Sequence, residues 1–85
     1  MFIAVCYFSL DSSADSRLTQ RIKDKVFARF KLSLSEVGEG GIVLAAALVS
    51  KDENYLRSLF AKVLKFIEES EGVRIESETL EVIQR

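Results

Sequence analysis

Three of the chain's four glycines lie within four residues, in the run GEGG at residues 38–41, near the middle of the sequence. Glycine adopts positive φ without strain, so this run between two apolar segments predicts the tight connection of a β-hairpin. Before it, residues 32–35 alternate leucine and serine, which predicts a half-buried strand. After it, residues 42–49 are apolar and include three consecutive alanines, which predicts a strand inside the sheet.

Each half of the chain also contains a helix pattern and a second strand. Residues 2–10 are almost wholly apolar and end at a polar Asp/Ser segment, which predicts a central strand. Apolar residues then recur at helical spacing between residues 17 and 30, and again between residues 56 and 67. From residue 73 the chain alternates once more, and a change of phase predicts a bulge or strand end near 77–79.

Capping signals mark the predicted helix ends. Ser12 and Asp15 have the spacing of a capping pair before the first helix, and Lys31 follows its last apolar residue. Ser50 and Glu53 form a capping box before the second helix, and Gly72 stands where a left-handed residue ends it. Both helices are therefore bounded by local sequence.

The predicted order of elements is βαββαβ, within one domain over residues 1–85 and without proline. This order predicts a ferredoxin-like α+β fold, in which right-handed crossovers place both helices on one face of a four-stranded antiparallel sheet. The first and third strands are the most apolar, so we expect them to be the central pair.

Strand alternation assigns residues to the two faces of the sheet. The residues expected to face the helices are Ala4, Cys6, Phe8, Leu34, Ile42, Leu44, Ala46 and Leu48, meeting Leu18, Ile22, Val26, Leu56, Phe60, Val63 and Ile67. The opposite face carries a second apolar set on the two central strands, Ile3, Val5, Tyr7, Val43, Ala45, Ala47 and Val49. An apolar patch of this size is expected to be buried by another molecule. We expect a second copy of the chain in a two-fold homodimer, with a partner protein or a ligand as the competing cover.

Composition restricts the chemistry. The chain has no histidine and one cysteine, Cys6, which excludes histidine acid–base catalysis, Cys/His zinc sites and an intrachain disulfide. Cys6 lies mid-strand and is expected to be a buried core thiol. The acidic residues are explained by helix ends and solvated faces, and the glycine run lacks the Lys and Ser/Thr of a phosphate loop. We therefore expect no catalytic residue, no metal and no cofactor, and a chain that is not an enzyme. No segment is long and apolar enough for a membrane span to be expected.

Charge is segregated along a chain whose net charge is only −1. Residues 17–31 contain six basic residues and one acid, whereas residues 68–81 contain six acids and one base. Arg17, Arg21 and Lys25 follow one another at a spacing of four on the first helix. They are the candidate nucleic-acid contact, for RNA phosphates or an acidic protein. The alternative is a solvated helix face that complements the acidic segment.

Three segments resemble the YlxP-like family of small bacterial proteins: FKLSLSEV at 30–37, ALVSKD at 47–52 and VLKFIE at 63–68. The resemblance covers about residues 28–83. It implies a ferredoxin-like fold, a cytoplasmic location and a role linked to RNA or the ribosome. The basic segment that family members carry at the start of the first helix is absent, since residues 11–16 here are short and acidic.

Two functions are therefore expected. By resemblance, the chain is a non-enzymatic accessory protein that contacts the ribosome or RNA. From its residues alone, it is a homodimeric regulatory or ligand-binding module without a nucleic-acid role.

Overall fold

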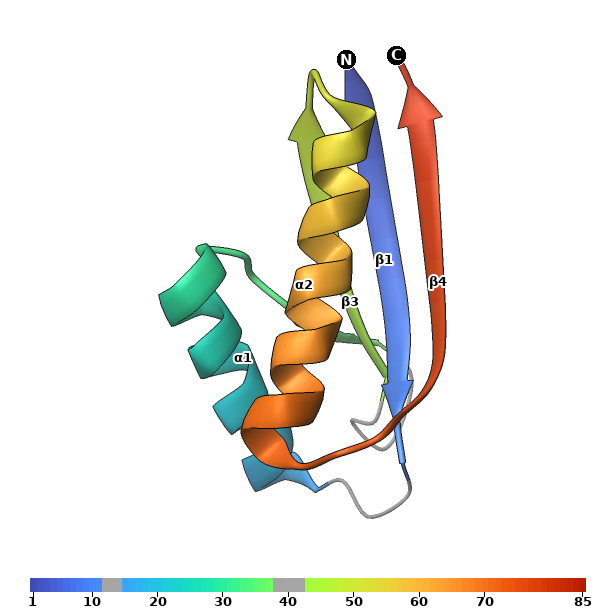
Figure 1. The fold of residues 1–85 in the computed structure, drawn as a ribbon. Helices are drawn as coiled ribbons and strands as arrows, with labels where there is room; N and C mark the ends of the chain where they lie inside the picture. The colour runs from blue at the N-terminus through green and yellow to red at the C-terminus, as the bar shows by residue number, and fades with distance from the viewer. Residues whose placement is uncertain (12–14, 38–42) are drawn as a thin grey trace.

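A computed structural model of the chain describes residues 1–11, 15–37 and 43–85. Its elements, in the order predicted, are β1 (Phe2–Leu10), α1 (Ser16–Phe30), β2 (Ser35–Val37), β3 (Val43–Ser50), α2 (Glu53–Glu71) and β4 (Ile75–Gln84) (Figure 1). Together they form the ferredoxin-like βαββαβ fold. The predicted hairpin turn and Ser12 lie outside the described residues.

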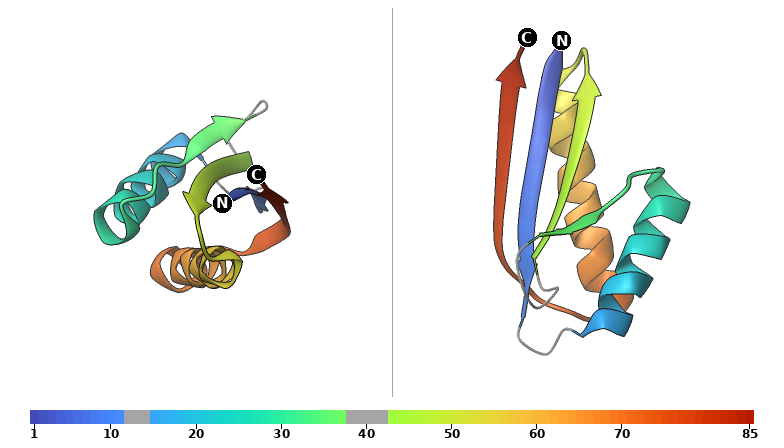
Figure 2. Two further views of the ribbon diagram at one scale, coloured as in Figure 1. Left: turned by 90° about the horizontal axis from the view of Figure 1, so that it is seen from above. Right: turned by 180° about the vertical axis from the view of Figure 1, so that it is seen from behind.

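The sheet has the order β2-β3-β1-β4, and every neighbouring pair is antiparallel. β1 and β3 are the central strands, as their apolar composition predicts. Both helices lie on one side of the sheet, and the other side carries no helix (Figure 2). The two termini lie side by side, since the Met1 amino group donates to the Arg85 carbonyl at 3.1 Å.

The core lies between the helices and the sheet face formed by even-numbered residues of β1. Ala4, Cys6, Phe8 and Leu10 are each no more than 2% exposed. The predicted helix-facing set is buried against them, except that Leu18 and Leu48 are half-buried and Ile42 lies outside the described residues. Period-two and helical spacing therefore predicted the core correctly.

Helix capping differs from the prediction at α2. Asp52, not Ser50, is the N-cap, and its carboxylate accepts from the backbone N–H groups of Asn54 and Tyr55. Ser50 lies two residues before the N-cap, and its hydroxyl instead accepts from the Asp52 N–H at 3.1 Å. Asp15 is the N-cap of α1 and accepts from the Leu18 N–H at 2.9 Å.

The C-terminal ends of the helices follow the sequence signals. Lys31 and Gly72 both adopt left-handed backbone, with φ of 57° and 64°. Each residue's N–H donates to a carbonyl four residues earlier, which closes the last turn of its helix.

Two strand boundaries also differ from the sequence pattern. β2 begins only at Ser35, although Leu32 and Leu34 before it are buried, because side-chain burial does not require backbone pairing. In β4 the register with β1 shifts between Ser9–Ser77 and Leu10–Ile75, so Glu76 is an extra residue. The predicted bulge therefore exists, one residue before the predicted range.

Candidate functional site

The sheet face without helices, here called the open face, contains all seven apolar residues expected there. The register pairs Ile3 with Val49, Val5 with Ala47, Tyr7 with Ala45 and Ser9 with Val43, which places these side chains on one side of the sheet. Among them Tyr7 and Val49 are 42% and 52% exposed. The face is therefore apolar and uncovered in the single chain.

β4 extends the open face beyond the predicted set. Ile83 pairs with Ile3 and Thr79 with Tyr7, and Ile83 is 45% exposed. Glu81, opposite Val5, is the one charged residue among the described positions of this face. The sequence predicted this strand and its change of phase, but none of its residues was assigned to the open face.

The centre of the open face is hollowed. Tyr7, Ala45, Ala47 and Val37 line a shallow depression of about 290 Å³. The alanines leave this space because their side chains end at Cβ. At one end of the face the hydroxyls of Ser9 and Ser77 lie 2.7 Å apart across the strands.

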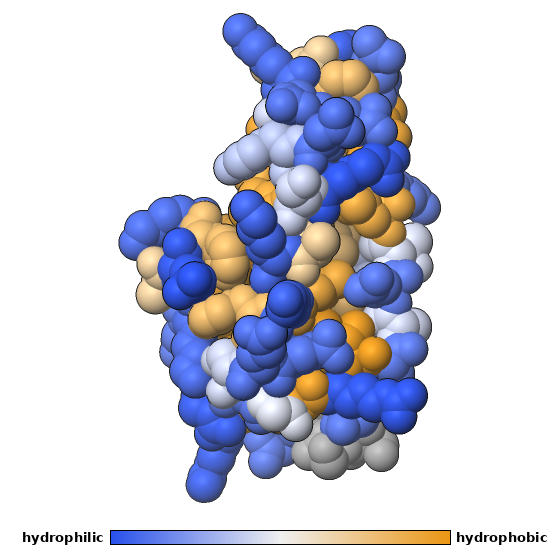
Figure 3. Space-filling model, in the orientation of Figure 1, coloured by the Kyte–Doolittle hydropathy of each residue, from blue (hydrophilic) through white to orange (hydrophobic). Residues whose placement is uncertain are grey.

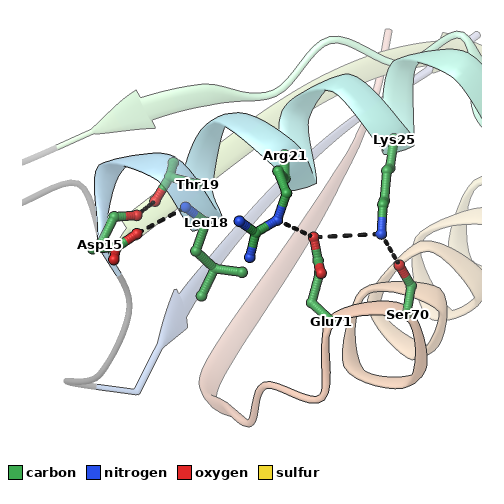
Figure 4. Close-up of polar contacts among 7 residues, drawn as sticks. All are labelled: Asp15, Leu18, Thr19, Arg21, Lys25, Ser70 and Glu71. Atoms are coloured by element: carbon green, nitrogen blue, oxygen red, sulfur yellow. Dashed lines mark hydrogen bonds and ion pairs between the residues drawn. The ribbon is translucent and has the colours of Figure 1, made fainter.

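The basic flank of α1 packs against the C-terminal end of α2. Glu71 accepts from Arg21 Nε at 3.2 Å and lies 3.5 Å from Lys25 Nζ, which also donates to the Ser70 hydroxyl (Figure 4). The Glu71 side chain is only 9% exposed, whereas those of Arg21 and Lys25 are 58% and 46% exposed. One carboxylate thus offsets the charge of two of the three candidate nucleic-acid residues. This contact agrees with the alternative in which the basic helix face complements the acidic segment at residues 68–81. Arg17 is exposed at the start of the helix.

A second basic group, not found from the sequence, lies at the other end of α1. The Arg29 guanidinium lies 5.1 Å from the ring centroid of Phe66 and 5.8 Å from that of Phe30, while the two rings pack edge to face. Lys62, Lys65 and Glu69 of α2 line a depression beside these rings, and Lys65 Nζ lies 3.9 Å from Glu69 Oε1. The interhelical contact brings these residues together, so no local spacing could reveal them.

Cys6 is the buried thiol that the sequence predicts, at 2% exposed. Burial, with a smaller contribution from the negative charge of Glu78, raises the pKa of the Cys6 thiol from 9.0 to about 11. The thiol is therefore neutral at pH 7 and a poor nucleophile. Across residues 1–11, 15–37 and 43–85, no three Cys, Asp or Glu side chains gather in a way that could hold a metal ion.

Comparison with known sequences identifies the family. The protein family described as "Protein of unknown function (DUF503)" matches the chain over residues 17–79. The chain belongs to this family. No curated protein sequence matches it.

A solved structure from Deinococcus radiodurans, described as a "putative antibiotic biosynthesis monooxygenase", is similar in fold. It is 12% identical, with a TM-score of 0.58 over 100% of this chain and 92% of the other. At this identity the similarity shows the fold alone.

The same comparison corrects the expectation that the chain is not an enzyme. That expectation came from the missing histidine and the inert cysteine, yet a protein of this fold is described as an oxygenase. The expectation is therefore not upheld, because this architecture is compatible with an enzyme. Among the described helices, none is long and apolar enough to cross a membrane.

Proposed function

We propose that the protein is a homodimeric regulatory or ligand-binding module whose two copies pack open face to open face. The observation that carries this proposal is the exposure of Tyr7, Val49 and Ile83 on a face where Glu81 alone among the described residues is charged. Leaving such a patch in water is unfavourable, and a two-fold axis buries it against its own copy.

The dimensions of the open face are those of a small self-complementary interface. Three strands paired over eight positions and the three-residue β2 give a face of about 440 Å² for each copy. Two copies then bury about 900 Å², which is the size of a weak or transient interface. The shallow depression at Ala45 and Ala47 lets Tyr7 of a second copy approach closely.

Light scattering at tens of micromolar tests the dimer. The expected mass is twice that of one chain. Ala45→Lys should give a monomer, because it places a charge in a desolvated interface. Ala28→Lys, at an exposed position of α1, is the matched control and should remain dimeric. A monomer mass for the unaltered chain would refute the proposal.

RNA or ribosome contact is a second candidate, in line with the YlxP-like resemblance, which we propose as the finer description of the family. The observation that favours it is that Arg17, Arg21 and Lys25 remain substantially exposed on one flank of α1. Arg29 and Lys62 extend the basic surface along the helix layer, where Lys65 is paired with Glu69 at 3.9 Å. The contact would be electrostatic and therefore sensitive to salt.

Two variants test the RNA candidate in opposite directions. Replacing Arg17, Arg21 and Lys25 with Glu should abolish co-sedimentation with RNA or ribosomes. Glu71→Gln should strengthen it, because the carboxylate that offsets two of these cations is removed. Co-sedimentation that is unchanged in both variants would exclude this flank.

A further inference from the structure

The helix layer closes the core over β1 but leaves part of β4 uncovered. On the helix side of β1, Cys6 and Phe8 are each 2% exposed. Their register partners on β4 are Leu80, which is half-buried, and Glu78, which is exposed. At Glu78 the strand therefore carries a charged residue where closure of the core would require an apolar one.

A pocket of about 180 Å³ lies at this place, between α2 and β4. It is called here the α2–β4 pocket. Cys6, Phe60, Leu64 and Leu80 supply an apolar lining, and Arg57 and Glu78 supply charge. Hydrophobic side chains are visible between α2 and β4 on the helix side of the molecule (Figure 3). Its volume suits a ligand the size of one benzene ring, because apolar cavities of about 150 Å³ accept benzene.

The charges at the pocket favour a cation. Arg57 Nε donates to Glu53 Oε2 at 2.9 Å, so a neighbouring carboxylate offsets the guanidinium. Glu78 forms no ion pair within the described part of the chain. Glu78 lines the same pocket as the buried Cys6, so its charge lies close to the apolar part of the pocket. A carboxylate ligand would be repelled, whereas an ammonium group would be attracted.

We propose that the α2–β4 pocket binds a small organic amine, with its apolar body against Phe60 and Leu64 and its ammonium group facing Glu78. A metal ion does not fit this donor set, which has one carboxylate and a neutral thiol. The pocket lies on the helix side of the sheet and the open face on the other side. Binding is therefore independent of whether the chain dimerises.

Titration of the isotope-labelled protein with benzylamine, followed by NMR, tests the proposal. We expect shifts confined to the residues around the pocket, with a Kd of about 1 mM for a ligand of this size. Benzyl alcohol, which has the same ring without the charge, should bind about fivefold more weakly, since the partly exposed Glu78 contributes a modest ion pair.

Two variants separate the charge from the cavity. Glu78→Gln should lower benzylamine affinity to that of benzyl alcohol and leave benzyl alcohol unchanged. Ala61→Leu, at an exposed α2 position that lines the pocket, should abolish binding of both probes by filling it. Ala28→Leu makes the same change on the exposed surface of α1 and should bind like the unaltered protein.

Three results would overturn the proposal. The first is the absence of shifts around the pocket at 10 mM benzylamine. The second is equal benzylamine affinity in the unaltered protein and Glu78→Gln. The third is binding that survives Ala61→Leu in a variant whose spectrum shows the native fold.

Discussion

Phe60→Ala tests the packing between α2 and the sheet most directly. The Phe60 ring is 2% exposed and lies in the buried cluster with Cys6, Phe8 and Leu44. Removing a buried phenylalanine side chain costs about 3–5 kcal/mol, from lost transfer free energy and the cavity left behind. Phe60 also lines the α2–β4 pocket, so part of the new space joins a pocket that already exists. We therefore expect a loss near the lower end, about 3 kcal/mol.

Urea unfolding at one fixed protein concentration measures this loss, because dimerisation would make the apparent stability depend on concentration. Phe27→Ala is the matched control: Phe27 is 52% exposed on α1, and its removal should change stability by about 0.5 kcal/mol or less. A loss well below 1 kcal/mol for Phe60→Ala would mean that the assigned helix face does not pack on the sheet.

Three further predictions test individual features. Because the pKa of Cys6 is raised from 9.0 to about 11 in the folded chain, its contribution to stability is complete below pH 9 and is lost as the pH rises towards 11. In denaturation of Cys6→Ala, the free energy of unfolding should decline less between pH 9 and 11 than in the unaltered protein. The same pH dependence in both proteins would contradict this prediction. Asp52→Ala should lower the free energy of unfolding in urea by about 1 kcal/mol, because the N-cap of α2 is lost, and Ser50→Ala should lower it less. A larger loss for Ser50→Ala would show that Ser50 is the N-cap. Gly72→Ala should cost about 1 kcal/mol from the left-handed backbone alone, since a Cβ there meets no atom within 4 Å, and a neutral thermal shift would contradict this.

The open face shows how far sequence periodicity reaches. Its seven apolar residues on β1 and β3 were predicted because alternation along an unbroken strand assigns every second side chain to one face. Ile83 was missed because the prediction assigned open-face apolar residues only on the two central strands, and the position of Ile83 beside Ile3 depends on the pairing of β4 with β1.

The order of elements, the two faces of the central strands, the buried cysteine and the glycine at the end of α2 are all determined by local sequence. Each depends on residues within a few positions of one another, where spacing and backbone preference act directly. The pairing of Glu71 with Arg21, 50 residues away, was decided only by the tertiary structure. So was the α2–β4 pocket, which joins Cys6 of β1 to Phe60 of α2 and Glu78 of β4. Which sequence-distant side chains meet depends on how the helices are placed over the sheet, and no periodicity within one element contains that information.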